Sequence, residues 1–152
     1  DNVDLIINLQ ADLPNIKPSS ISKLEKLMRE SNSPIGTLAS KLTKDEINDE
    51  NVVKVELETD LKEDSFLKAK NFFRIKKDLK NEKIYHHVGI YCFQSSQLKK
   101  YVELGESRQE KILKLEQIRL MGNIEIKVGY CDSNPLSIDT LEDLKRVEKE
   151  MS

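Results

Sequence analysis

The sequence predicts a single domain of the α/β class, because segments typical of strands and of helices roughly alternate along its 152 residues. The clearest strand signal is a run of apolar residues near the start: Leu5, Ile6, Ile7 and Leu9. An apolar run with almost no polar face is typical of a central parallel strand covered on both sides. A second strong strand pattern at 84–93, and helical spacing of apolar residues at 19–30, support the same class.

Composition places the chain among ordinary globular domains. The formal net charge is -2, which gives no reason to expect binding to nucleic acid or to a membrane surface. No apolar run approaches the roughly 20 residues of a membrane span, and there is no signal-peptide pattern. Cys92 and Cys131 stand far apart without metal-like spacing, which is typical of reduced thiols in the cytoplasm. Cys92 lies in an apolar run and is predicted to be a core residue, and no pattern supports the alternative of a catalytic cysteine.

The first half of the chain gives four further elements. Pro18 and Ser19 suit the first turn of the helix at 19–30. Residues 35–42 form a strand pattern with small side chains, and Thr43 with Glu46 fits a capping box that opens a short helix. Alternating β-branched residues predict a strand within 51–57. Lys54 in that strand is directed either toward a ligand or toward solvent, and solvent is the favoured interpretation.

The middle of the chain is rich in charge and holds both histidines. An apolar island at 72–75 predicts a short strand, and the basic run at 76–83 is either a solvated loop or a lid over a negatively charged substrate. His86 and His87 lie next to each other in the strand at 84–93, so they face opposite sides and cannot chelate one metal from one face. Gly89 in the same strand indicates a close approach of backbone or ligand.

The last third predicts three helices and a strand. Residues 96–104 have a helical pattern, and Ser107 with Glu110 fits a capping box for a helix that ends at Gly122. A polar face of that helix is typical of solvent exposure: Glu110, Glu116, Gln117 and Arg119. Residues 124–128 alternate like a strand, and Thr140 with Asp143 fits a cap for a final helix at 141–151.

Two carboxylates stand where ligands bind in α/β sheets. Pro14 ends the first strand, which leaves Gln10 and Asp12 at its carboxyl end. Asp12 there is a suitable oxygen ligand for Mg²⁺, and the alternative is that it only caps the turn before Pro14. Asp139 lies just before the last helix and is a candidate partner for Asp12. No glycine-rich phosphate loop is present in the sequence.

Several motifs in order carry a resemblance to a known family. They occupy residues 8–14, 51–55, 87–91, 115–119 and 138–144. Each motif is weak alone, but the ordered set resembles the CMP-Kdo synthetases, the 3-deoxy-D-manno-octulosonate cytidylyltransferases. The chain corresponds to roughly the C-terminal three-fifths of such an enzyme.

The resemblance implies a Rossmann-like nucleotide-diphospho-sugar transferase fold, with a mixed, mostly parallel sheet flanked by helices. It implies a cytoplasmic homodimer that couples CTP to Kdo, giving CMP-Kdo and pyrophosphate for lipopolysaccharide biosynthesis. Residues 1–152 then form one partial nucleotidyltransferase domain whose N-terminal strand and nucleotide-binding loop are expected to be missing. We therefore predict that this chain alone does not catalyse the reaction.

The resemblance also implies roles for individual residues. Asp12 and Asp139 would be the catalytic pair that holds Mg²⁺, Gln10 would lie beside the nucleotide and sugar, and Arg74 would lie near the sugar carboxylate. Four further residues fall where the family lines its Kdo pocket: His87, Tyr91, Glu110 and Gln117. The sequence departs from the family pattern at several neighbouring positions: Ala11, Leu13, Phe73, Arg108, Gln109 and residues 76–78. These departures bear more on the sugar pocket than on the two aspartates.

Two other classes of function remain open. The chain can belong to a cytidylyltransferase for another sugar acid, which substrate competition would distinguish. It can also be a non-catalytic α/β module whose helices at 107–121 and 140–151 serve assembly.

Overall fold

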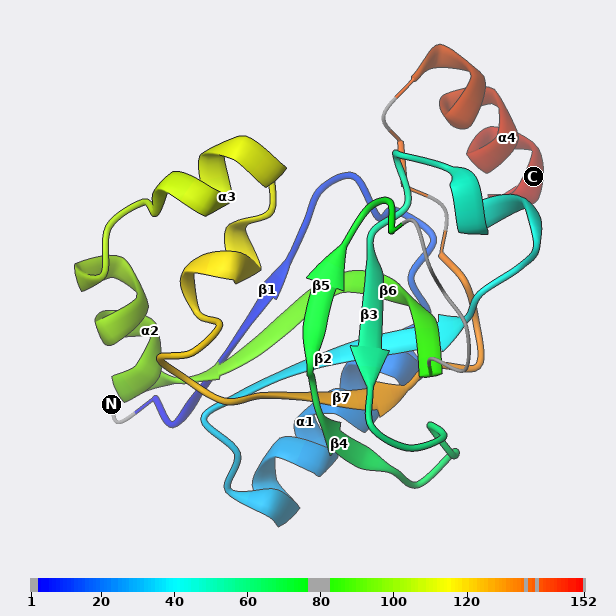
Figure 1. The fold of residues 1–152 in the computed structure, drawn as a ribbon. Helices are drawn as coiled ribbons and strands as arrows, with labels where there is room; N and C mark the ends of the chain where they lie inside the picture. Colours follow the sequence, from blue (N-terminus) through cyan, green and yellow to red (C-terminus); the bar gives the residue numbers. More distant parts are fainter. Residues whose placement is uncertain (1–2, 77–82, 136, 139, 152) are drawn as a thin grey trace.

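The computed structural model describes residues 3–76, 83–135, 137–138 and 140–151, which form one mixed sheet flanked by helices (Figure 1). The strands are β1 (Leu5–Leu9), β2 (Ile35–Lys41), β3 (Lys54–Leu57), β4 (Phe66–Lys68), β5 (Asn71–Phe73), β6 (Lys83–Gln94) and β7 (Ile126–Tyr130). The α-helices are α1 (Pro18–Ser31), α2 (Ser95–Glu103), α3 (Arg108–Leu113) and α4 (Leu141–Met151), and two 3-10 helices are η1 (Asp45–Asn48) and η2 (Glu116–Arg119). The predicted α/β class with a mixed sheet is confirmed.

Strand β6 is the centre of the sheet. It pairs antiparallel with β2 along most of its length, with β1 through residues 90–94 and with β3 through residues 83–86. The full strand order is β4-β7-β2-β6-β3-β5, with β1 beside the carboxyl half of β6. The prediction that residues 5–9 form a central parallel strand is wrong, because β1 pairs antiparallel and Leu9 is 46% exposed. An apolar run reports burial and carries no information on strand direction.

The expectation of a mostly parallel sheet is also wrong. Among the described strands, β2 and β7 form the one parallel pair, and the other five pairings are antiparallel. Strands β3, β4 and β5 follow one another without an intervening α-helix, so no helical crossover is available to make them parallel. β4 was not predicted from the sequence, and its three residues are too short for an alternating pattern to be recognised.

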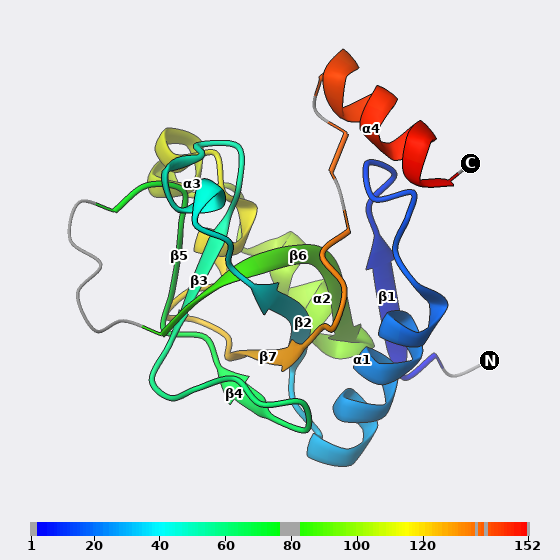
Figure 2. The same ribbon diagram turned by 90° about the vertical axis from the view of Figure 1, so that its right-hand side faces the viewer.

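Two hydrophobic clusters cover the two faces of the sheet. Successive residues of β6 point to opposite faces, so Ile90 and Cys92 join one cluster while Tyr91 and Phe93 join the other. Helix α1 packs on the first face through residues such as Leu24, and Figure 2 shows this helix lying alongside the sheet. Helix α2 and η2 cover the second face. Cys92 is buried as predicted, and burial raises the pKa of its thiol to about 11.

The predicted helix from 107 to 121 is interrupted. The capping box of Ser107 and Glu110 is present and opens α3, as predicted. Helix α3 ends at Leu113, and Lys114 follows with a left-handed φ of 52°. A new 3-10 turn, η2, then begins at Glu116. The break turns the chain inward, because Leu113 before it is exposed and Leu115 after it is buried.

The other predicted elements lie within a few residues of their observed bounds. α1, α2, β2, β6 and α4 agree closely with their predicted ranges, whereas β7 lies two residues later than predicted. Thr140 and Asp143 form the predicted cap, in which Thr140 Oγ1 accepts a hydrogen bond from Asp143 N at 3.2 Å. Most of the basic run at 76–83, namely 77–82, lies outside the described residues. In the part of the chain that the structure describes, no helix is long and apolar enough to cross a membrane.

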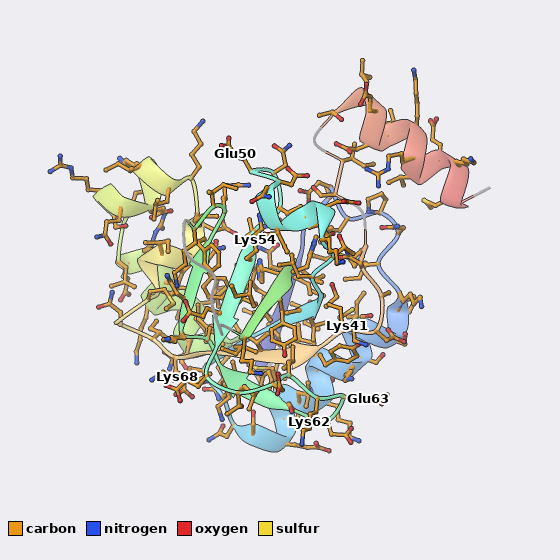
Figure 3. All side chains as sticks on the ribbon, turned by 45° about the vertical axis from the view of Figure 1, so that its right-hand side comes forward. Lys41, Glu50, Lys54, Lys62, Glu63 and Lys68 are labelled. Carbon is orange, nitrogen blue, oxygen red and sulfur yellow. The ribbon has the colours of Figure 1, made fainter. Side chains whose placement is uncertain are left out.

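Lys54 occupies neither of the two environments considered from the sequence. Its side chain is directed inward from β3 and is 1% exposed, whereas Lys41, Lys62 and Lys68 are exposed (Figure 3). Its ammonium group donates to the backbone carbonyls of Asp49 and Arg74, at 2.5 and 2.6 Å. Burial lowers the pKa of Lys54, and the two carbonyls compensate the buried charge.

Candidate active site

A cavity of about 270 Å³ lies between β1, β6, α2 and η2. Its wall is mainly apolar, with a few polar side chains: Ile6, Ile7, Asn8, Tyr91, Phe93, Leu98, Tyr101, Glu116, Gln117 and Leu120. Figure 1 shows α2 and α3 beside β1, which pairs with β6 in the sheet. An apolar pocket with a few convergent polar groups is the usual form of a small-molecule site. Of the residues predicted from the sequence, Tyr91 and Gln117 line this cavity.

Gln10 lies at the edge of the cavity and is held there by Glu116. Its Nε2 donates to Glu116 Oε1 at 3.2 Å, which joins the end of β1 to η2. A Cβ atom added at Gly89 would lie 3.0 Å from Gln10 Oε1, so the glycine makes room for this side chain. The close approach predicted at Gly89 is therefore confirmed, and the approaching group is Gln10.

Tyr91 presents a buried hydroxyl to this region. The residue is 3% exposed, and its hydroxyl oxygen has no hydrogen-bond partner among the described residues. Burial raises the pKa of Tyr91 well above its ordinary value, so the group is a neutral phenol. A neutral phenol is able both to donate a hydrogen bond to a ligand oxygen and to accept one.

His87 lies behind Tyr91, with their ring centroids 5.4 Å apart. Its Nε2 is 2.9 Å from Thr37 Oγ1, whose single hydroxyl proton also has the carbonyls of Ile90 at 2.7 Å and Val88 at 3.2 Å within reach. When Thr37 donates to a carbonyl, His87 Nε2 carries the proton that it donates to Thr37. Burial lowers the pKa of His87 to about 3, so the ring is neutral at physiological pH. His86 points the other way and contacts Glu46, as the alternation predicted.

Asp12 follows β1 and is the second group with an unpartnered polar atom. Its Oδ1 is buried and has no hydrogen-bond partner in the described part of the chain. Its Oδ2 accepts from Ser137 Oγ at 3.5 Å, and its backbone oxygen accepts from Ile138 N at 3.0 Å. The segment that precedes α4 thus contacts Asp12 directly. Asp139, the predicted partner, lies outside the described residues.

Glu110 is not among the residues that line the cavity. Its carboxylate binds Arg119 in a bidentate pair at 2.6 and 2.9 Å and also accepts from Ser107 N at 3.1 Å. These hydrogen bonds, chiefly that from Arg119, lower the pKa of Glu110. The guanidinium of Arg119 lies over the ring of Tyr101, 4.8 Å from its centroid. The pair therefore fastens α3 to η2, the element that carries Gln117.

Arg74 is also engaged with the protein itself. Its Nη1 donates to the carbonyls of Glu50 and Asn51, both at 3.0 Å, and its Nη2 lies 3.5 Å from the carbonyl of Lys114. Arg74 is not among the residues that line the cavity. Its guanidinium connects the loop before β3 to the break between α3 and η2.

Three polar residues of the cavity wall were not predicted as site residues: Asn8, Tyr101 and Glu116. Glu116 stood in the same motif as Gln117, but its position on a predicted continuous helix favoured solvent exposure. Tyr101 extends a row of tilted aromatic rings from Tyr91 through Phe93. Nothing in the sequence alone indicated that row.

Comparison with known proteins identifies the family. The sequence model described as cytidylyltransferase matches residues 1–127. This chain belongs to the cytidylyltransferase family. It is 40% identical over 146 residues to the 3-deoxy-manno-octulosonate cytidylyltransferase of Bartonella quintana (strain Toulouse), covering 95% of this chain and 59% of that protein. It is also 40% identical over 151 residues to the enzyme of the same name from Thermodesulfovibrio yellowstonii, again covering 95% and 59%.

A solved structure supports the same relationship. A CMP:2-keto-3-deoxy-manno-octonic acid synthetase complexed with CTP superimposes with a TM-score of 0.84 at 30% identity. The superposition covers 99% of this chain and 63% of that protein. The chain therefore spans about three-fifths of the length of its curated relatives, and the fold of that part of the cytidylyltransferase is retained here.

Proposed function

We propose that the full-length protein containing this chain is a cytidylyltransferase that couples CTP to Kdo, releasing pyrophosphate in a Mg²⁺-dependent reaction. The cavity and the end of β1 would form part of its active site. The homodimer and the cytoplasmic location implied by the resemblance belong to the same proposal. The CTP complex of the similar synthetase and the names of the similar enzymes support the choice of substrates.

The observation that carries this proposal is a pair of buried polar atoms without partners. These atoms are Tyr91 Oη and Asp12 Oδ1: Tyr91 lines the cavity and pairs with Asn8 of β1, and Asp12 follows that strand in the chain. A buried polar atom without a hydrogen bond costs free energy, so such atoms require a reason. A sugar hydroxyl at Tyr91 and a divalent cation at Asp12 would each supply the missing partner.

The proposed chemistry needs no nucleophile from the protein. The anomeric hydroxyl of the sugar would attack the α-phosphorus of CTP in line, and pyrophosphate would leave. Mg²⁺, when bound, would supply positive charge beside the phosphates. Asp12, with Asp139, would hold this ion through carboxylate oxygens. The protein would otherwise contribute positioning.

The lining residues would bind and orient the sugar. Gln10, Tyr91, Glu116 and Gln117 offer hydrogen-bonding groups toward or beside the cavity. His87 would act from behind Tyr91 by fixing the wall at that point. In this proposal Glu110 and Arg74 hold the wall in place, instead of touching the sugar.

The test measures Kdo-dependent release of pyrophosphate from CTP and Mg²⁺, with the full open reading frame assayed beside residues 1–152. We expect activity in the full-length protein and none in the 152-residue chain. Asp12→Asn and Asp139→Asn should each lower kcat by at least about tenfold, because changing even a residue that only supports a metal ligand costs about 10–100-fold. Asp64→Asn changes an exposed carboxylate in the connection between β3 and β4 and serves as the matched control.

The outcomes separate the alternatives. Release of pyrophosphate with a different sugar acid but not with Kdo would assign another substrate to the same site. A folded full-length protein that is inactive with every sugar acid, and that CTP and Mg²⁺ do not stabilise, would favour a non-catalytic module. Turnover by the 152-residue chain would refute the expectation that it is inactive alone.

A further inference from the structure

The described residues between β7 and α4, 131–135 and 137–138, connect the sheet to Asp12. This segment leaves the sheet where Cys131 N donates to the carbonyl of Ala39 at 2.8 Å. It reaches Asp12 through Ile138 N, at 3.0 Å from the backbone oxygen, and through Ser137 Oγ. Figure 2 shows the described parts of this segment between β7 and α4. Asn134 lies in the chain between these two attachments.

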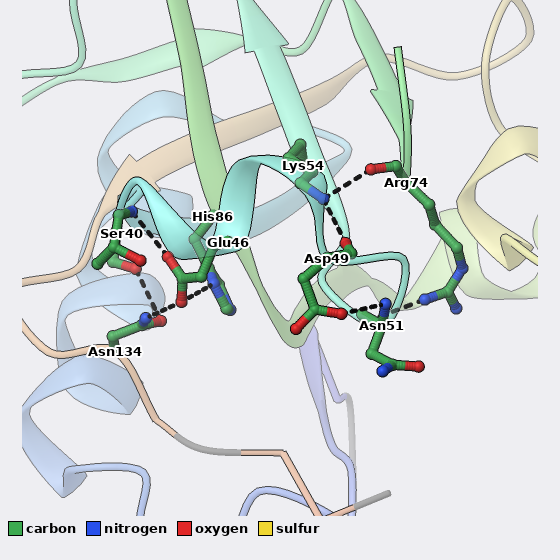
Figure 4. Close-up of polar contacts among 9 residues, drawn as sticks. Ser40, Glu46, Asp49, Asn51, Lys54, Arg74, His86 and Asn134 are labelled. Atoms are coloured by element: carbon green, nitrogen blue, oxygen red, sulfur yellow. Dashed lines mark hydrogen bonds and ion pairs between the residues drawn. The ribbon is translucent and has the colours of Figure 1, made fainter. Parts of the chain in front are cut away.

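Asn134 holds the middle of this segment with both ends of its side-chain amide. Its Oδ1 accepts from Ser40 Oγ at 3.0 Å, and its Nδ2 donates to Glu46 Oε1 at 2.7 Å (Figure 4). The two partners have opposite polarity, so they fix the amide in one orientation. Pro135 follows and has no N–H to donate, which increases the dependence of this stretch on the side chain of Asn134.

Glu46 is the anchor to which Asn134 is attached. Its Oε1 also lies 3.0 Å from His86 Nδ1, and its Oε2 accepts from Thr43 N at 2.8 Å (Figure 4). Burial acts to raise the pKa of Glu46, but the hydrogen bond from Thr43, the charge of His86 and the hydrogen bond from Asn134 together lower it. The carboxylate is therefore ionised and accepts hydrogen bonds only. Side-chain exposures of 16% for His86 and 17% for Glu46 show that solvent has limited access to this pair.

We propose that Asn134 is a positioning residue, which bridges Ser40 and Glu46 and thereby sets the contact of Ser137 and Ile138 with Asp12. This inference rests on the proposed function, in which Asp12 holds the divalent cation. The hydrogen bonds of Asn134 connect Ser40, near the carboxyl end of β2, to the proposed cation site, and they add no ligand to that site. Its loss should loosen the segment and weaken cation binding, while the cavity between β1 and η2 should keep its affinity for the sugar.

The test compares Asn134→Ala with Asn123→Ala in the full-length protein. Asn123 also uses its side-chain amide for one hydrogen bond, to the carbonyl of Arg119 at 3.2 Å, but it is exposed and lies outside the segment. Three quantities are measured: the exchange rate of the Ile138 amide, the half-saturating concentration of Mn²⁺ in the presence of CTP, and the KM for Kdo. Mn²⁺ serves as a paramagnetic probe, so that binding is measured without turnover.

We expect Asn134→Ala to raise the Ile138 exchange rate and the Mn²⁺ half-saturation by about tenfold each, the effect of one hydrogen bond to a charged group. The KM for Kdo should change by less than about twofold, a ratio worth under about half a kcal/mol. Asn123→Ala should change none of the three. In the double variant Glu46→Gln with Asn134→Asp, the amide and the carboxylate change places, so one can still donate to the other. We expect Asn134→Asp alone to raise the Ile138 exchange rate and the Mn²⁺ half-saturation, and the double variant to restore both.

Equal effects of the two alanine variants, or lower stability with unchanged Ile138 exchange and Mn²⁺ binding, would overturn the inference. So would a full-length protein that does not bind Mn²⁺ at all. If the protein lacks Kdo-dependent activity but Asn134→Ala still changes exchange and Mn²⁺ binding, the positioning role stands and the substrate assignment fails. The two proposals can therefore fail separately.

Discussion

Replacing Tyr91 with phenylalanine removes one of the two buried polar atoms that lack a partner. The hydroxyl of Tyr91 is hydrated in the unfolded chain and loses that hydration on folding, without a protein partner in the described residues. Phenylalanine keeps the ring, including its tilted contacts with His87 and Phe93. The substitution should therefore increase the free energy of unfolding and, in the full-length enzyme, weaken binding of the sugar.

The expected magnitude follows from the cost of an unsatisfied buried group. That cost is about 1–3 kcal/mol, and removing the group should recover most of it. For a chain of about 150 residues, each kcal/mol corresponds to about 2–4 °C in Tm. We therefore expect Tyr91→Phe to raise Tm by at least about 2 °C. A stabilising substitution of this kind at a binding site is the pattern expected when stability has been exchanged for function.

The matched control is Tyr85→Phe, the same change at a tyrosine whose hydroxyl has a partner. Tyr85 Oη accepts from Leu61 N at 2.8 Å, so its removal leaves a backbone donor without an acceptor. This variant should lose about 1 kcal/mol. Chemical denaturation followed by circular dichroism measures both changes, and the sign should be opposite for the two tyrosines. Equal destabilisation by both substitutions would refute the reasoning, because the Tyr91 hydroxyl would then be hydrogen-bonded in the folded protein.

Two further predictions concern pH and helix capping. Because the pKa of His87 falls from 6.5 to about 3 on folding, the unfolded chain binds a proton that the folded chain does not. Between pH 6.5 and about pH 3, the free energy of unfolding should thus fall by up to about 1.4 kcal/mol per unit of decreasing pH. Denaturant titrations of His87→Gln should show a slope smaller by that amount in this range. Ser107→Ala removes the cap of α3, in which Ser107 Oγ accepts a hydrogen bond from Glu110 N at 3.0 Å. We expect the free energy of unfolding, measured by the same titrations, to fall by about 1 kcal/mol. An unchanged denaturation midpoint would contradict a stabilising role for this cap.

The sequence predicted burial and secondary structure better than it predicted strand order. The apolar runs at β1 and β6 identified two strands correctly, because burial selects apolar side chains wherever the strand lies. Direction and neighbours depend on connections that hydrophobicity does not encode. Strands were predicted at 51–57 and 72–75, but β4 between them was not, and the sequence did not show that β3 pairs with β5 while β4 pairs with β7, both antiparallel.

In the candidate site too, the motifs indicated which segments take part but not which side chains reach the cavity. Tyr91 and Gln117 line the cavity, whereas Glu110, which the resemblance also assigned to the sugar pocket, is buried against Arg119. Glu116, which was expected only on a solvent-exposed face, is exposed and also lines the cavity. The reason is the left-handed residue Lys114, which interrupts the helix and turns Glu116 toward Gln10. A single backbone dihedral thus decided which carboxylate reaches the cavity, and a lysine at that position gives no signal comparable to a glycine.

The distribution of hydrogen bonds over the molecule gives independent weight to the candidate site. Away from the candidate site, buried charged groups have hydrogen-bond partners. The ammonium group of Lys54 donates to two backbone carbonyls, and the carboxylate of Glu110 accepts from Arg119 and from Ser107 N. In the described residues, the two buried side-chain atoms without partners belong to Tyr91, which pairs with Asn8 of β1, and to Asp12, which follows that strand. The sugar and the divalent cation of the proposed function would supply a partner to each of them.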